Sequence, residues 1–217
     1  MRRGTLTSID ELKKQQSCGR YQRVARWNLE PAQAVTALAA VNSVQSPLAF
    51  CATSDRRLHI LDAAVGCVAR STDCGHDRPV HCIALPCPSV YASLPMDCYG
   101  MFATAATDNA VALWDLRDPA VVMRYTGHTN RHCEHVQCAL SPCLRFLAVG
   151  SEDRAARIVD IRTGKELVRL TGHRDVVTGV SFNPLFPQLA TASFDGKVKF
   201  FLDPYTTGGD PSVLGKV

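Results

Sequence analysis

The sequence predicts an all-β protein made of about four similar sheets, each a four-stranded antiparallel meander. The chain has 217 residues, of which 46% are hydrophobic and 20% are charged, as in globular proteins with a buried core. A Gly-His pair opens each of three segments, and a turn aspartate recurs at intervals of about 45 residues. These aspartates are Asp55, Asp108, Asp153 and Asp195. Such a period indicates repeated units of supersecondary structure.

The segments between these marks have the composition of β-strands. Residues 177–182 are rich in β-branched and apolar residues, 189–193 form a second such run, and 197–201 begin with alternating polar and apolar side chains. The tight turn before the third run contains Gly196, which tolerates a positive φ. In the preceding repeat, a turn at 162–165 joins the third strand to a fourth. We therefore expect four consecutive strands in each repeat.

The repeats divide the chain into six parts. We expect a basic segment without repeat character (1–30), a degenerate first repeat (31–72), a second repeat with a loop insertion (73–124), a third repeat (125–169), an incomplete fourth repeat (170–203) and a C-terminal tail (204–217). The insertion is rich in proline, which is typical of a surface loop. A fourth strand is not evident in the last repeat.

The repeats resemble the WD-repeat family of β-propellers, in which Gly-His opens and Trp-Asp closes each unit. Trp114-Asp115 is the literal closing pair, and Leu61, Val159 and Phe201 stand in the tryptophan place of the other repeats. The resemblance implies a propeller of four-stranded antiparallel blades, about four of which are present. Because propellers of this family usually have about seven blades, we expect the chain to be part of a larger propeller or a short form of one.

The resemblance also implies structural roles. In each repeat a histidine, a serine or threonine, an aspartate and a tryptophan are expected to form a buried hydrogen-bonded network. The matching residues are His76, Asp108 and Trp114 in the second repeat, His128, Ser151 and Asp153 in the third, and His173, Ser193 and Asp195 in the fourth. The first repeat offers Thr53 and Asp55, and Ala106 occupies the Ser/Thr place of the second. No network is then complete, and each leaves a hydrogen bond unmade.

The sequence favours a non-catalytic protein. His173, Ser193 and Asp195 are the residue types of a hydrolase triad, but the repeat pattern already accounts for them. No nucleophile elbow, phosphate-binding glycine loop or metalloprotease motif is present. Residues 128–138 contain a dense group of potential zinc ligands, yet their spacing fits no common zinc site. We therefore expect no cofactor, no metal and no small-molecule substrate, with a structural or loop role for 128–138 favoured over a metal site.

Charge and cysteine usage limit the partners and the compartment. The net charge of +4 is carried by residues 1–30, and the rest of the chain has none. Nucleic acid is therefore an unlikely partner, and a solvated basic segment is favoured over a contact with nucleic acid or anionic lipid. No apolar run approaches the length of a membrane span. Ten cysteines without a Cys-x-x-Cys pair or a secretory signal favour a reducing compartment, cytoplasmic or nuclear.

Protein partners are thus the leading expectation, and the family resemblance suggests where they bind. Seven residues are expected on the face formed by the Gly-His loops, and they are His81, Thr107, Glu134, Glu152, Val176, Thr178 and Phe194. Phe194 is the candidate anchor, because exposed aromatic residues are enriched at interface hot spots. A turn-packing role for Phe194 remains the alternative. The leading function is an intracellular scaffold for protein–protein interactions.

One short motif supports an alternative function. Trp114-Asp115-Leu116-Arg117 resembles the motif by which WD-repeat substrate receptors dock on the adaptor of cullin-4 ubiquitin ligases. Ala112 departs from that pattern, where a basic residue is usual. The alternative is therefore a receptor subunit of such a ligase that docks through Arg117, and the competing interpretation is plain repeat consensus.

Overall fold

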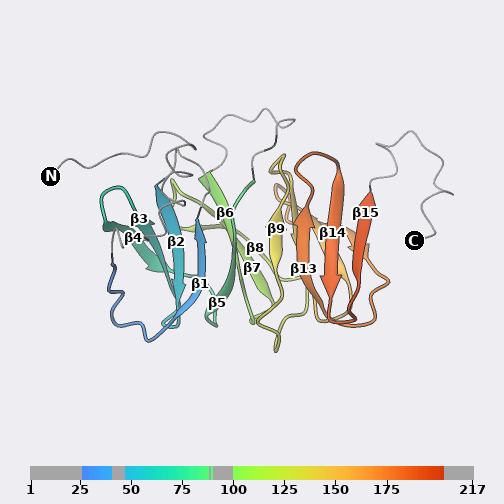
Figure 1. Ribbon diagram of the computed structural model, residues 1–217, viewed down its shortest axis with the longest axis horizontal. Helices are drawn as coiled ribbons and strands as arrows, with labels where there is room; N and C mark the ends of the chain where they lie inside the picture. The colour runs from blue at the N-terminus through green and yellow to red at the C-terminus, as the bar shows by residue number, and fades with distance from the viewer. Residues whose placement is uncertain (1–25, 41–46, 88, 90–99, 203–217) are drawn as a thin grey trace, which may run out of the picture.

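The computed structural model describes residues 26–40, 47–87, 89 and 100–202, which form four antiparallel sheets side by side along the longest axis (Figure 1). The first sheet contains β1 (Val35–Ala40), β2 (Leu48–Thr53), β3 (Arg57–Asp62) and β4 (Cys67–Asp73). The second contains β5 (Val80–Ala84), β6 (Met101–Ala106), β7 (Ala110–Asp115) and β8 (Val121–Tyr125). The third contains β9 (Cys138–Leu140), β10 (Phe146–Val149), β11 (Ala156–Asp160) and β12 (Glu166–Leu170). The fourth contains β13 (Val177–Phe182), β14 (Gln188–Ser193) and β15 (Val198–Leu202).

Each sheet is a meander in which consecutive strands pair with each other. The first three sheets have four strands, and the fourth has three within the described residues. The predicted all-β architecture of repeated antiparallel sheets is therefore confirmed. The basic segment (through residue 25), most of the proline-rich insertion (90–99) and the tail (203–217) lie outside the described residues.

The recurring aspartate lies in the turn between the second and third strands of each sheet. The residue after it takes a left-handed conformation in all four repeats, with φ of 63° at Arg56, 61° at Asn109, 67° at Arg154 and 73° at Gly196. The carboxylate of Asp108 accepts the N–H of Ala110, and that of Asp195 accepts the N–H of Lys197. This side-chain support allows non-glycine residues at positions that would otherwise favour glycine.

Three apolar clusters hold neighbouring sheets together. Phe50, Phe102 and Trp114 belong to the cluster between the first and second sheets. Leu113 and Leu147 belong to the cluster between the second and third sheets. The cluster between the third and fourth sheets includes buried valines of β13. Each sheet thus buries a face against its neighbour, as blades of a propeller do.

The innermost strands β1, β5, β9 and β13 lie next to one another in that order. The first and last sheets lie at opposite ends of the longest axis, so the described sheets form an open row (Figure 1). No described segment is a helix with the length and hydrophobicity that a membrane crossing requires.

Candidate protein-binding site

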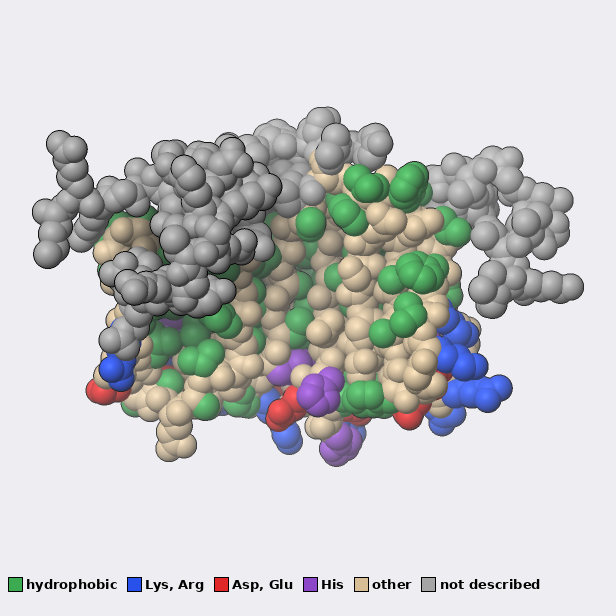
Figure 2. Space-filling model, viewed as in Figure 1, with side chains coloured by type: hydrophobic (Ala, Val, Ile, Leu, Met, Phe, Trp, Pro, Cys, Tyr) green, Lys and Arg blue, Asp and Glu red, His purple; other side chains and the backbone are tan. Residues whose placement is uncertain are grey.

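The loop at 132–135 and the segments around Glu152, Val176 and Phe194 form a shared surface. It lies at the edge of the molecule that carries the Gly-His loops, here called the Gly-His face. Val176 directly precedes β13 and Phe194 directly follows β14, and Figure 1 shows the start of β13 and the end of β14 at its lower edge. The N–H of Phe194 donates to the carbonyl of Val176 over 3.1 Å, which joins the two segments. Histidine and charged side chains gather along the same edge below β9 and β13 (Figure 2).

Glu152 holds the neighbouring loop in place. One oxygen of its carboxylate accepts the backbone N–H groups of Arg131, His132 and Cys133 over 2.9, 2.7 and 2.8 Å. Partial burial opposes ionisation of Glu152, but these hydrogen bonds outweigh it and lower the pKa of the carboxyl group. The charged carboxylate therefore anchors residues 131–133, a role beyond simple exposure to a partner.

The anchored loop and the fourth sheet enclose a groove of about 630 Å³, here called the Gly-His groove. Its lining residues are His132, Cys133, Glu134, His135, Glu152, Val176 and Phe194. A second hollow of about 310 Å³ shares Glu134 and His135 and reaches Thr178. Of the seven residues expected on this face, four line the Gly-His groove, His81 and Thr178 line the second hollow, and Thr107 lines neither.

The groove combines an apolar wall with acidic groups. Phe194 is 56% exposed and meets the ring of His135 edge-on at a centroid distance of 6.3 Å. Glu134 is exposed and lies where the two hollows join. An aromatic face beside a carboxylate suits a basic side chain that carries an aliphatic stem. In the described part of the chain, no group of three or more His, Cys, Asp or Glu side chains is arranged to hold a metal ion.

Arg117 lies on the opposite face from this groove. The N–H of Leu116 donates to the carbonyl of Gly100, which fixes the end of β7 beside the start of β6. Trp114 is 3% exposed, whereas the side chain of Arg117 is 66% exposed and pairs with Asp115 over 3.7 Å. The motif thus contains one buried structural residue and one guanidinium directed toward solvent.

The hydrogen-bonded network of the second sheet is complete, contrary to expectation. Asp108 lies 3.0 Å from Nδ1 of His76, Nε2 of His76 lies 2.9 Å from the hydroxyl of Thr104, and the indole N–H of Trp114 donates to that hydroxyl over 2.9 Å. Although burial opposes its ionisation, Asp108 has a pKa of about 2 because it accepts hydrogen bonds from His76 and from two backbone N–H groups. Because a charged Asp108 only accepts hydrogen bonds, Nδ1 of His76 is the donor in the bond between them.

The fourth sheet repeats this arrangement with a different hydroxyl from the expected one. Nε2 of His173 lies 2.9 Å from the hydroxyl of Thr191, and Nδ1 lies 3.1 Å from Asp195. Ser193, which the sequence assigned to the network, instead donates to the carbonyl of Asp175. Ser193 and Thr191 are two residues apart and share one side of an ideal strand, but Thr191 lies opposite the imidazole, whereas Ser193 lies at the end of β14 beside Asp175.

The third sheet lacks the expected network. His128 is 3% exposed and neither ring nitrogen has a hydrogen-bond partner among the described residues, while Ser151 bonds with the backbone of Thr129. Asp153 instead pairs with the guanidinium groups of Arg157 and Arg169. Burial first, and the charge of Arg157 second, lower the pKa of His128 to about 4. The expected grouping of His128, Ser151 and Asp153 is therefore wrong.

Comparison with known proteins decides what these repeats are. The WD domain, G-beta repeat family matches residues 120–160 and 164–201. The chain contains WD repeats. Residues 120–160 contain β8 of the second sheet and three strands of the third, and residues 164–201 contain β12 and most of the fourth sheet.

Several curated proteins are similar to this WD-repeat chain. The "WD repeat-containing protein 26 homolog" of Drosophila melanogaster is 33% identical over 96 residues, which is 44% of this chain and 15% of the relative. "GID complex subunit 7" of Schizosaccharomyces pombe is 36% identical over 90 residues, 41% of this chain and 18% of the relative. "Coronin-7" of Bos taurus is 33% identical over 128 residues, 52% of this chain and 12% of the relative. The chain therefore corresponds to less than a fifth of the length of each of these relatives.

In this WD-repeat chain, the position that decides the network lies four residues before the turn aspartate. It is Thr104 in the second repeat, Thr191 in the fourth, Val149 in the third and Cys51 in the first. This position has the same strand register in three sheets. Thr104, Thr191 and Val149 each pair across the sheet with the residue four places after the turn aspartate. The sequence contains this signal. The prediction instead gave the role of the network's hydroxyl to the position two residues before the aspartate.

Proposed function

We propose that this chain is a non-catalytic WD-repeat scaffold whose Gly-His groove binds a segment of a partner protein. The observation that carries the proposal is the convergence of an exposed aromatic side chain and two carboxylates from two sheets in one groove. Phe194 supplies apolar area, and the loop that carries Glu134 is held by Glu152 before any partner arrives. Such preorganisation reduces the entropy lost on binding.

The groove chemistry favours a partner segment with a lysine or arginine next to an apolar residue. Glu134 offers a carboxylate to the cationic head, while Phe194 and Val176 contact its aliphatic stem and its neighbour. The name of the relative "GID complex subunit 7" describes that protein as part of a complex, which supports an interaction role. Other relatives carry different names, such as "Coronin-7", so no particular complex is proposed.

Affinity capture with matched variants tests this function. Partners captured by the wild-type chain are expected to be lost with Phe194→Ala and weakened with Glu134→Gln. Phe186→Ala is the control, because Phe186 is similarly exposed at 61% but lies in the turn between β13 and β14, away from the groove. Retention of the same partners by Phe194→Ala and Glu134→Gln would reject the groove as the binding site.

Docking on the cullin-4 ligase adaptor is a second candidate, supported by the exposure of Arg117 next to the buried Trp114. Binding of the purified adaptor to the chain is expected to fall with Arg117→Ala while thermal stability stays unchanged. Arg162→Ala is the control, because Val159-Asp160-Ile161-Arg162 repeats the end of the motif without tryptophan. Equal adaptor binding by wild type and Arg117→Ala, or none by wild type, rules this candidate out.

A further inference from the structure

We propose that a groove between the second and third sheets, on the face opposite the Gly-His groove, binds a short segment of a partner protein that carries a large apolar side chain next to a carboxylate. It is here called the inter-sheet groove. It has a volume of about 710 Å³, and its use does not depend on the Gly-His groove. The occupant differs in charge from the one that suits the Gly-His groove.

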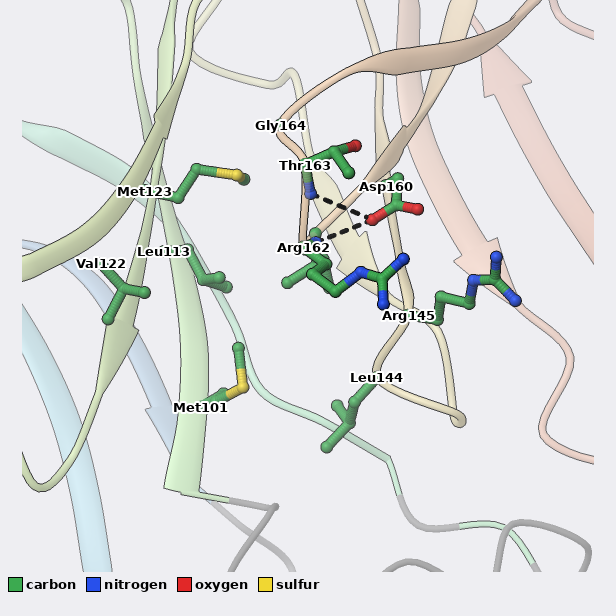
Figure 3. Close-up of a pocket in the computed structure, with 11 residues that line it drawn as sticks. Met101, Leu113, Val122, Met123, Leu144, Arg145, Asp160, Arg162, Thr163 and Gly164 are labelled. Atoms are coloured by element: carbon green, nitrogen blue, oxygen red, sulfur yellow. Dashed lines mark hydrogen bonds between the residues drawn. The ribbon is translucent and has the colours of Figure 1, made fainter.

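Two walls of different chemistry form the inter-sheet groove (Figure 3). The wall from the second sheet consists of Met101, Leu113, Val122 and Met123. The wall from the third sheet consists of Leu144, Arg145, the turn after β11 and Asp160. In Figure 3 Leu144 points toward Met101 across an open space, whereas the side chains of Arg162 and Arg145 extend along the third sheet, with the guanidinium of Arg162 nearer the apolar wall.

The apolar wall is partly accessible. Leu113 is 1% exposed and forms part of the core between the two sheets, whereas Val122 is 56% exposed. Met101, Met123 and Leu144 are partly buried and pack against the same core. Methionine side chains adapt to the shape of an inserted group because they are unbranched and polarizable. A partner's leucine, phenylalanine or methionine placed here would cover apolar surface that is now in contact with water.

The other wall carries a net positive charge. The single carboxylate in the lining, Asp160, is 6% exposed and already accepts the N–H groups of Arg162 and Thr163 over 2.8 and 3.2 Å. The guanidinium of Arg145 lies over the ring of Phe146 at 5.4 Å from its centroid. Neither Arg145 nor Arg162 forms an ion pair with a carboxylate of the described residues.

The combination of these walls selects the occupant. A guanidinium recognises a carboxylate through two parallel hydrogen bonds, and the adjacent apolar wall excludes water from one side of that contact. An extended peptide places side chains on alternate sides at about 3.3 Å per residue, so an apolar residue and an acidic neighbour one or two positions away can reach both walls. A purely apolar segment would leave the two arginines without a partner, and a basic segment would be repelled by them.

A peptide array tests this site. One series of eight-residue peptides has a central Leu, Phe or Met with Asp or Glu one or two positions away, and the matched series has Asn or Gln in place of the acid. Acidic peptides are expected to bind the 217-residue chain at least tenfold more tightly than their amide matches. Arg162→Gln and Val122→Asp are each expected to reduce that affinity at least tenfold, with thermal unfolding used to confirm that both variants fold. Arg131→Gln removes a charge on the Gly-His face and is expected to leave binding unchanged.

A second measurement needs no variant of the chain. A photo-crosslinking group at the apolar position of the tightest peptide is expected to label Val122, Met123 or Leu144. Labels confined to other regions, affinities equal for acidic and amide peptides, or full binding by folded Arg162→Gln and Val122→Asp variants would each overturn the proposal. Loss of binding in Phe194→Ala but not in these variants would assign the peptides to the Gly-His groove instead.

Discussion

At the scale of single residues, two histidines of the same sequence motif have opposite surroundings. His76 is fully paired, since Asp108 and Thr104 occupy both of its ring nitrogens. His128 stacks on Tyr125 and has no hydrogen-bond partner among the described residues. A buried polar group without a partner costs about 1–3 kcal/mol, so the third sheet is expected to be less stable locally than the second.

Trp114 is predicted to contribute through both its volume and its N–H group. Trp114→Ala removes a side chain packed against Phe102 between two sheets and is expected to lower the free energy of unfolding by about 3–5 kcal/mol. Trp114→Phe keeps an aromatic ring but leaves the hydroxyl of Thr104 without its indole donor, so a smaller loss of about 1–3 kcal/mol is expected beyond any change in packing. Chemical denaturation measures both. Near-wild-type stability of Trp114→Ala would contradict the packing described here.

His128 is predicted to make stability depend on pH. Its pKa is about 4 in the folded chain, compared with 6.5 when unperturbed, because burial and the charge of Arg157 disfavour the charged ring. Above pH 6.5 the ring is neutral in both states and its contribution is complete. As the pH falls from 6.5 to 4, the unfolded chain takes up a proton first, and about 3 kcal/mol of stability is lost.

Replacement of the ring separates this effect from other titrations. His128→Leu is expected to raise stability at pH 5 relative to wild type and to flatten the dependence between pH 6.5 and 4, as measured by denaturation at each pH. His132→Gln is the control, because His132 is exposed and should leave the pH dependence in place. An unchanged pH profile in His128→Leu would mean that another group controls acid unfolding.

Sequence reasoning located the histidines and aspartates but not their hydroxyl partners. The motif gives the order of residues, whereas the identity of the partner depends on which side of β6 or β14 faces the imidazole. Ala106 and Ser193 lie two residues from Thr104 and Thr191 and therefore share their side of an ideal strand, so strand alternation alone did not exclude them. The deciding feature is how far along the strand each hydroxyl lies from the imidazole. This distance is known only when the strands are paired in register.

At the scale of elements, periodicity predicted strands well. Residues 177–182 coincide with β13, and the run at 189–193 falls within β14. The third strand of that sheet begins one residue later than expected, at Val198. Contacts between elements could not be predicted from the sequence. Glu152 holds a loop about twenty residues earlier in the chain through backbone N–H groups, which every residue type except proline has, so the side-chain pattern does not indicate the contact.

Glu152 is predicted to control the order of the 131–133 loop. Glu152→Gln keeps an acceptor oxygen but loses the charge that strengthens three N–H bonds, so about 1–2 kcal/mol of local stability is expected to be lost. Hydrogen exchange of the amides of 131–133 is then expected to accelerate roughly tenfold or more, with global stability changed less. Glu134→Gln is the control, because Glu134 accepts none of these bonds. Equal exchange rates in both variants would show that the loop is held by other contacts.

At the scale of the whole molecule, two grooves on opposite faces carry charged side chains of opposite sign. The Gly-His groove contains Glu134 and Glu152, whereas the inter-sheet groove contains Arg145 and Arg162. Apolar clusters between neighbouring sheets join the parts of the molecule that carry the two grooves. This arrangement would allow one chain to hold two partners of opposite charge at once, which is the physical content of a scaffold role.

The end of the row formed by the fourth sheet is predicted to cause self-association. Val198 and Phe200 alternate along β15 and are 61% and 70% exposed, and β15 pairs only with β14 within the described residues. An apolar side-chain row on an incompletely paired strand offers both apolar area and backbone hydrogen-bonding groups to another chain. The 217-residue chain is therefore expected to show a sedimentation coefficient that rises with concentration.

Val198→Lys with Phe200→Lys is expected to shift the sedimentation coefficient toward that of the monomer, because a cationic strand edge repels its copy. The matched pair Val35→Lys with Leu38→Lys changes similarly exposed residues on β1, which also pairs with a single strand at the other end of the row, and tests whether the first sheet provides a second association surface. A wild-type chain that sediments as a monomer at all concentrations would show that this end of the row does not mediate association.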